Sequence, residues 1–251
     1  MKLRNIISIF ALSALIFTSC DHPVVPADAV KEDRLPQIQP DYTEVTVPCN
    51  ICPLNFTVME GATDVVAKYT YPKGVTTFGN GKKVMIEENE WKSMLKHAKG
   101  KSIKVEVFAK VNNQWKAFKP FNIYISNDSI DRYISYRVIQ PSYVAYEQLS
   151  INQRDITCFE ENEIYSNMSV STEANGQCIN CHSYKNYKTD HMLFHMRQAL
   201  GGTMIVDGGT LKKVDLKTDE TISAGVYPAW HPTKNLIAFS TNKTGQSFHT
   251  K

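Results

Sequence analysis

Apolar and polar residues alternate along much of the first half of the chain. The alternation is clear at Leu54, Phe56 and Val58, and again at Ile103 and Val105. A period of two places every second side chain on the same face of an extended strand, so these stretches predict β-strands with one buried face. Turn signals between them, such as Gly-Asn-Gly, indicate antiparallel hairpins. We therefore expect residues 41–128 to form an antiparallel β-sandwich within a mainly β protein.

One segment of this region has the period of a helix instead. Residues 87–99 begin with acidic residues, end with lysines and are followed by Gly100. Acidic residues favour the positive start of a helix, basic residues favour its end, and glycine is a common stop signal. Four apolar residues share one stripe of this expected helix and should form its buried side: Trp91, Met94, Leu95 and Ala98.

The first forty residues predict export and attachment to a membrane. Residues 1–20 have a basic start and an apolar stretch at 6–17, which spans about 18 Å as a helix and is too short for a bilayer core of about 30 Å. The small residues before Cys20 resemble the lipobox of bacterial lipoproteins, so Cys20 is the expected lipidation site and the anchor in the cell envelope. An ordinary secretory signal is the alternative. Residues 21–40 contain four prolines and predict a stiff tether.

Composition and charge exclude several classes of protein. The chain has 251 residues, 42% of them hydrophobic and 21% charged, which is the composition of a folded globular protein. A mean hydropathy of −0.31 excludes several membrane spans. The formal net charge is +3. Lys2 and Arg4 of the leader supply two of these charges, so charge does not favour a nucleic-acid partner.

Two stretches of the second half of the chain, residues 129–170 and 201–251, have distinct sequence patterns. Residues 129–170 are rich in tyrosine and mixed in pattern, so we expect a connector that packs against its neighbours. Residues 201–251 alternate again, and their Tyr-Pro-Ala-Trp-His-Pro and Ile-Ala-Phe-Ser steps resemble the repeat of TolB-like β-propellers. We expect an incomplete propeller blade there, as part of a longer protein, because a single blade leaves apolar faces exposed. A hairpin sheet packed on the first domain is the alternative.

The strongest chemical signal is the run Cys-Ile-Asn-Cys-His at 178–182. This C-x-x-C-H spacing is the attachment pattern of c-type haem, in which two thiols bond to the haem vinyl groups and the histidine ligates the iron. With six cysteines and seven histidines in the chain, about 0.004 chance occurrences are expected. Residues 171–200 are therefore the expected haem-attachment segment, with haem c on Cys178 and Cys181 and with His182 as the iron ligand.

Other interpretations use the same residues. In an oxidising compartment Cys178 and Cys181 could form a disulfide, and the spacing to His191 and His195 is also compatible with a zinc site. If haem is bound, we favour His195 as the sixth iron ligand. The alternatives are an open position, which binds small ligands, or another donor of the same segment: His191, Met192 or Met196.

Several motifs beyond Pro53 together resemble one family. They include Gln-Arg-Asp at 153–155, Cys-x-x-Cys-His-Ser at 178–183 and His-Met-Arg at 195–197. In these motifs and in its propeller-like segment, the chain resembles Bacteroidetes lipoproteins that combine an N-terminal β-domain, a C-x-x-C-H segment and a TolB-like propeller, and that are often labelled cytochrome c-related. The resemblance implies this architecture rather than a particular activity.

A second C-x-x-C motif, which is not followed by histidine, departs from that family. Export makes a disulfide between Cys49 and Cys52 the expected state, with a redox-active pair as the alternative. Cys158 is then left without a partner and is expected to be a buried thiol.

These observations predict a membrane-tethered, c-type cytochrome-like lipoprotein that acts as an electron carrier or a redox-linked scaffold for an unknown partner. The alternative is a non-redox binding lipoprotein that recognises glycan or protein and has a structural Cys178–Cys181 disulfide or metal site. A third candidate is peroxidase-like or gas-sensing chemistry at an open haem. The sequence has no phosphate-binding loop, nucleophile elbow, zinc-protease motif or EF-hand, so a role other than an enzyme is favoured.

Overall fold

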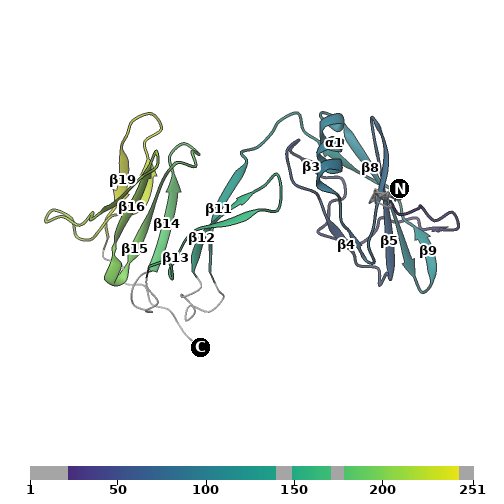
Figure 1. Ribbon diagram of the computed structural model, residues 1–251, viewed down its shortest axis with the longest axis horizontal. Coiled ribbons are helices and arrows are strands. Elements are labelled where there is room, and N and C mark those ends of the chain that lie inside the picture. The colour runs from purple at the N-terminus through teal and green to yellow at the C-terminus, as the bar shows by residue number, and fades with distance from the viewer. Residues whose placement is uncertain (1–21, 140–148, 171–177, 243–251) are drawn as a thin grey trace, which may run out of the picture. The chain divides into compact units, whose positions relative to one another are not determined.

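The computed structural model describes residues 22–139, 149–170 and 178–242 (Figure 1). The expected signal peptide and Cys20 lie outside these ranges. The chain divides into two compact units, the first made of Met1–Cys49 and Pro53–Asn127 and the second of Asn50–Cys52 and Asp128–Lys251. The fold is mainly β, as expected. Within the described ranges, no helix is long and apolar enough to cross a bilayer.

The larger sheet of the first unit is built around one long strand. Its seven strands are β1 (Val30–Lys31), β3 (Thr46–Val47), β5 (Asp64–Tyr71), β6 (Gly74–Phe78), β8 (Ser102–Val111), β9 (Gln114–Ala117) and β10 (Phe121–Ile125). The long strand β8 pairs antiparallel with β5, β9 and β10. Its alternate residues Ile103, Val105 and Val107 are fully or almost fully buried, which confirms the strand that their spacing predicts.

Among its described residues, the first unit also contains a smaller sheet and one helix. The sheet contains β2 (Ile38–Gln39), β4 (Phe56–Val58) and β7 (Lys83–Val84). The helix α1 (Glu88–Ala98) lies within the predicted range and buries the four predicted residues. Its first turn is capped by the Glu87 carboxylate, which accepts a hydrogen bond of 2.8 Å from the Glu90 amide. Burial of one apolar stripe, rather than helix propensity alone, holds α1 in the unit.

Trp91 is the largest fully buried side chain, so its removal tests the packing of α1. We expect Trp91→Ala to lower the free energy of unfolding of the first unit by about 3–5 kcal/mol, because a large cavity remains in the core. Urea denaturation followed by circular dichroism measures this loss. Trp115→Ala is the control, because Trp115 is only partly buried in β9 and its loss should cost clearly less. Equal losses in the two variants would contradict this account of the core.

Within the described ranges, the second unit contains three antiparallel sheets. The first has β11 (Tyr133–Val138), β12 (Ser150–Asp155) and β13 (Glu161–Ser166); the second has β14 (Cys178–Tyr184), β15 (His191–Arg197), β16 (Gly202–Asp207) and β17 (Thr210–Val214); the third has β18 (Val226–Trp230) and β19 (Ile237–Ser240). A short 3₁₀ turn, Gln198–Leu200, joins β15 to β16. The segment expected as a connector thus forms a sheet of its own, and the C-x-x-C-H segment shares a sheet with the start of the expected blade.

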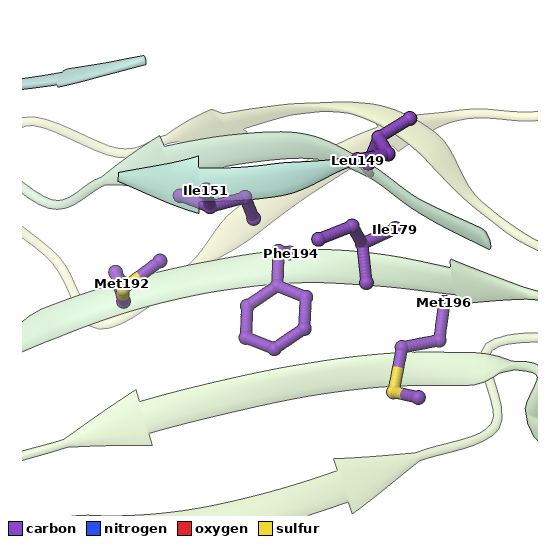
Figure 2. Close-up of a cluster of buried hydrophobic side chains, with 6 residues drawn as sticks. All are labelled: Leu149, Ile151, Ile179, Met192, Phe194 and Met196. Carbon is purple, nitrogen blue, oxygen red and sulfur yellow. The ribbon is translucent and has the colours of Figure 1, made fainter. Parts of the chain in front are cut away.

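A buried cluster joins the first two sheets of this unit (Figure 2). It contains Leu149 just before β12, Ile151 within β12, Ile179 in β14, and three alternate residues of β15: Met192, Phe194 and Met196. The Tyr165 ring of β13 packs on Phe194, with the two ring centroids 5.1 Å apart. The face of β14 and β15 that carries these side chains is therefore the core face of the four-stranded sheet.

Candidate functional site

The C-x-x-C-H motif lies on β14, which is an edge strand of its four-stranded sheet. Its pairing with β15 is interrupted: Asn180 pairs with His195 and Ser183 with Leu193, so Cys181 and His182 together oppose one residue of β15. This is a β-bulge with Cys181 in the left-handed region, at a φ of 50°. Such backbone is unfavourable for a residue other than glycine and is concentrated at functional sites.

The side chain of Asn180 stabilises this bulge. Its Oδ1 atom accepts hydrogen bonds from the Cys181 amide at 3.1 Å and from the guanidinium of Arg137 on β11. Both cysteines of the motif are partly exposed free thiols. The motif is therefore an irregular stretch of an edge strand whose bulge is stabilised by the hydrogen bonds of Asn180.

The pairing of β14 and β15 decides which way the motif residues point. Directly paired residues share a face of a sheet, and Ile179 pairs with Met196 on the core face. Cys178 pairs with Arg197, so it lies on the opposite face, which is also the face of His195. His182 lies on the core side, because its Nε2 atom is 3.4 Å from the carbonyl oxygen of Ser135 on β11.

His182 is a half-buried imidazole in a mixed polar and aromatic setting. Burial lowers its pKa, the hydrogen bond with the Ser135 carbonyl opposes this effect, and the charge of Arg137 lowers the pKa further. The Tyr184 ring packs edge-on at 6.3 Å between centroids, and its hydroxyl donates a 3.1 Å hydrogen bond to the Ser135 side chain. The lowered pKa favours the neutral imidazole, which is the form that ligates metals.

His195 is buried on the other face, with only 4% of its surface exposed. Its Nδ1 atom is 2.8 Å from the Thr203 hydroxyl oxygen, and its ring lies 5.9 Å from that of Phe239 in β19, measured between centroids. Burial, and then the charge of Arg197, lower its pKa. Its Nε2 atom is buried without a hydrogen-bond partner among the described residues.

The other expected donors near His195 are already engaged. The two ring nitrogens of His191 lie 2.8 Å from Asp190 and 3.0 Å from Asp207. Met192 and Met196 are 3% and 6% exposed within the core cluster. The methionines therefore pack as core residues, and His191 belongs to a surface network of acidic residues.

These placements allow a test of whether the predicted residues fit one haem. Covalent haem c requires two thiols and the proximal imidazole to converge on one side of one short segment. Cys178 and His182 lie on opposite faces of β14, and His195 lies on the face away from His182. In the extended conformation of β14, these residues therefore do not form a single haem site, and they do not form a zinc site.

The two cysteines of the second C-x-x-C motif are assigned to different units. Cys49 belongs to the first unit and Cys52 to the second, and both are free thiols. The Cys52 amide donates a 2.7 Å hydrogen bond to the carbonyl of Ile156. Burial raises the pKa of the Cys52 thiol, and Arg154 only partly opposes this effect. A raised pKa leaves little thiolate, so Cys52 lacks the activation typical of redox-active pairs.

A third cysteine lies in a cluster that the motifs do not indicate. The Sγ atom of Cys158 and carboxylate oxygens of Asp155 and Glu160 lie within 4.8 Å of one another, which resembles a metal site. Asp155, however, already accepts four hydrogen bonds. Arg132 donates two of 2.6 Å to Oδ2, and the Thr157 amide and hydroxyl donate two of 2.9 and 2.7 Å to Oδ1. This carboxylate therefore holds the β12–β13 turn and is not free to bind a cation.

Asp155 gives a stability prediction with a defined pH range. Burial would raise its pKa, but the Thr157 and Arg132 hydrogen bonds lower it from 3.8 to about 2. Because the folded-state pKa is lowered, the stabilisation is complete above about pH 4 and is lost as the pH falls toward 2.

We therefore expect Asp155→Asn to lower the free energy of unfolding of the second unit by about 2 kcal/mol at neutral pH, as is typical for hydrogen bonds to a charged group. The difference from the wild-type chain should shrink between pH 4 and pH 2. Urea denaturation at several pH values measures both effects. Asp131→Asn, a charge-matched change at an exposed position, should have little effect, and a similar loss there would contradict the role of Asp155.

A pocket that sequence reasoning missed lies beside His195. This cavity, the His195 pocket, has a volume of about 430 Å³ and lies between β15, β16 and the segments that precede and begin β18. The sequence motifs indicate three of its lining residues, His195, Met196 and Arg197. The other residues that matter chemically are Thr203, Asp215 and Lys217. They come from separate parts of the sequence with no shared spacing, so no local pattern indicates them.

Comparison with known proteins assigns neither a family nor a function to the chain. No family model, no curated protein and no solved structure matches the chain.

Proposed function

We propose that the protein is a membrane-tethered, c-type cytochrome-like lipoprotein of the cell envelope that carries one covalent haem on Cys178 and Cys181, with His182 as an axial ligand. The observation that carries the proposal is the C-x-x-C-H motif, whose residue types are each required by a bond to the cofactor. When bound, the haem would supply one-electron transfer to a redox partner.

Three features of β14 support a role of this segment beyond packing. It is an edge strand, its pairing with β15 is interrupted within the motif, and Cys181 has left-handed backbone. The lowered pKa of His182 favours its neutral form, and its hydrogen bond to the Ser135 carbonyl is long at 3.4 Å, so this contact holds the ring only weakly. The proposal requires the 178–182 segment to take another conformation when haem is attached, because Cys178 and His182 face opposite ways in the extended strand.

We also propose finer features of the fold. The four strands β14 to β17 form a consecutive antiparallel meander, which is the topology of one propeller blade, and β18 and β19 lie next in the chain as a hairpin. The Trp230 indole of β18 donates a long 3.4 Å hydrogen bond to the Ser183 carbonyl of β14, so this hairpin contacts the meander. For the first unit, two sheets with buried alternate residues support a sandwich.

The second candidate function is a non-redox binding lipoprotein for glycan or protein. One observation favours it: the thiols of Cys178 and Cys181 are free and partly exposed on an edge strand, so export to an oxidising compartment allows them to form a disulfide. Haem chemistry and this disulfide use the same sulfur atoms and exclude each other. One experiment therefore distinguishes the two functions.

The experiment is production of the full chain in a bacterium that exports it and attaches haem to cytochromes c. We expect an intact mass that includes one haem and a Soret absorption band that remains with the protein after denaturation. The double variant Cys178→Ala/Cys181→Ala should lose both signals, because it has no thiol to bond to the vinyl groups.

Cys49→Ala is the control and should keep the haem, since it removes a thiol outside the motif. A haem-free wild-type chain whose mass is lower by two hydrogens, with Cys178 bonded to Cys181, would support the binding lipoprotein instead. Covalent haem that persists in the double variant would contradict the assignment.

The membrane tether has its own test at Cys20. We expect the exported chain to enter the detergent-rich phase when a detergent solution is separated into two phases, and its N-terminal peptide to carry acyl chains by mass spectrometry. Cys20→Ala should move the chain to the aqueous phase, whereas Cys49→Ala should not. A Cys20→Ala chain that still enters the detergent phase and is acylated would show that another position carries the lipid.

A further inference from the structure

We infer that the His195 pocket binds a small molecule through a carboxylate group. The inference does not rest on haem, because the pocket lies on the face of the four-stranded sheet away from His182. It rests on a buried donor without a partner, on two unpaired cations and on a cavity of suitable size.

The first argument is the state of the His195 ring. The Thr203 hydroxyl is 3% exposed, and its one hydrogen-bond partner among the described residues is the His195 Nδ1 atom. The hydroxyl proton needs an acceptor, and Nδ1 can serve as one only if the ring proton is on Nε2. In the other tautomer, the Thr203 proton and the Nε2 lone pair would both be buried without partners. Nε2 is therefore a hydrogen-bond donor.

This donor has no acceptor among the described residues. Leaving a buried polar group without a hydrogen bond is unfavourable, so such groups in folded proteins usually have a partner or a function. His195 lines the pocket, but its Nε2 atom has less than 1 Å² of accessible surface, so a ligand oxygen supplies the missing acceptor only when the side chains that cover this atom move. The ring is held for this task by Thr203 on one side and by packing against Phe239.

The second argument is charge. Arg197 and Lys217 line the pocket, and within the described residues neither forms an ion pair. Arg197 lies near enough to His195 for its charge to affect the imidazole. A guanidinium donates two parallel hydrogen bonds to a carboxylate, which gives both affinity and a defined orientation.

The pocket also contains one acidic residue, which limits the charge of the ligand. Asp215 accepts a 2.9 Å hydrogen bond from the Lys217 amide and so shapes this wall. With Arg197, Lys217 and Asp215 together, the pocket has a net charge of about +1. A monoanionic carboxylate balances this charge, whereas a dianionic phosphate group would be repelled by Asp215.

The third argument is the size and construction of the cavity. Its volume of about 430 Å³ lies in the usual range for small-molecule sites, about 300–1,000 Å³. One wall comes from β15 and β16 and the other from residues 215–217 and 224–226. Gly225 allows this second wall to approach closely, because a Cβ atom there would lie 2.8 Å from the Phe239 Cβ. The ligand class is a compact organic acid.

The test is isothermal titration of the full chain with D-galacturonate, acetate, D-galactose and inorganic phosphate. Galacturonate and galactose share a ring, and only the first has a carboxylate. We expect saturable binding of galacturonate, weaker binding of acetate and none of galactose. Arg197→Gln should weaken galacturonate binding at least tenfold, because it removes the charged fork from an exposed position that folding does not need.

Lys212→Gln is the matched control, since it removes an exposed lysine of β17 that does not line the pocket. Nuclear magnetic resonance of the His195 Nε2 proton gives a second measurement, and its signal should shift on addition of galacturonate. Equal binding of galactose, tighter binding of phosphate, unchanged affinity in Arg197→Gln, or no saturable binding of either carboxylate would each overturn the inference.

Discussion

Burial of Ile179 fixes the orientation of β14 and, through it, the candidate sites of the second unit. Its side chain is fully buried in the core cluster, and its amide donates a 3.0 Å hydrogen bond to Asn167, a side chain that is itself 2% exposed. With Ile179 on the core face, its neighbour Cys178 must lie on the opposite face, because strand residues alternate. The core therefore determines where the first thiol of the motif points.

The bulge then reverses the alternation within the motif. In a regular strand Cys178, Asn180 and His182 would share one face, together with the paired His195. The extra residue at Cys181 turns His182 to the core side, next to Ser135 and Tyr184. One inserted residue thus separates two imidazoles that regular pairing would bring to the same face. It also explains why each has its own local partners: the Ser135 carbonyl for one, and Thr203 for the other.

Periodicity predicted the parts of the fold in which burial follows local sequence. The strand at Ile103 and Val105 and the stripe of α1 around Trp91 were predictable because one buried face leaves a regular spacing. The sheet of β11 to β13 was not, because its two outer strands bury little and show no clean alternation.

For the candidate sites, the sequence predicts which residue types are present but not which way their side chains point. The motif at 178–182 is evident in the sequence, but the faces of its residues depend on a bulge and on pairing with β15, which are not local properties. The His195 pocket is lined by segments about twenty residues apart, such as those of Arg197 and Lys217, and their meeting is not a local property.

The free-energy cost of releasing β14 from its extended conformation determines how strongly this conformation disfavours haem attachment. Releasing the start of β14 would expose Ile179, at about 1.5–3 kcal/mol, and would remove the hydrogen bond from its amide to Asn167, at about 1 kcal/mol. It would also relieve the left-handed backbone at Cys181, which costs about 1–3 kcal/mol. Release would also break the pairing of residues 178–180 with β15. The costs of release therefore exceed the strain that it relieves, and the haem proposal requires the bonds to the thiols to form before β14 pairs with β15.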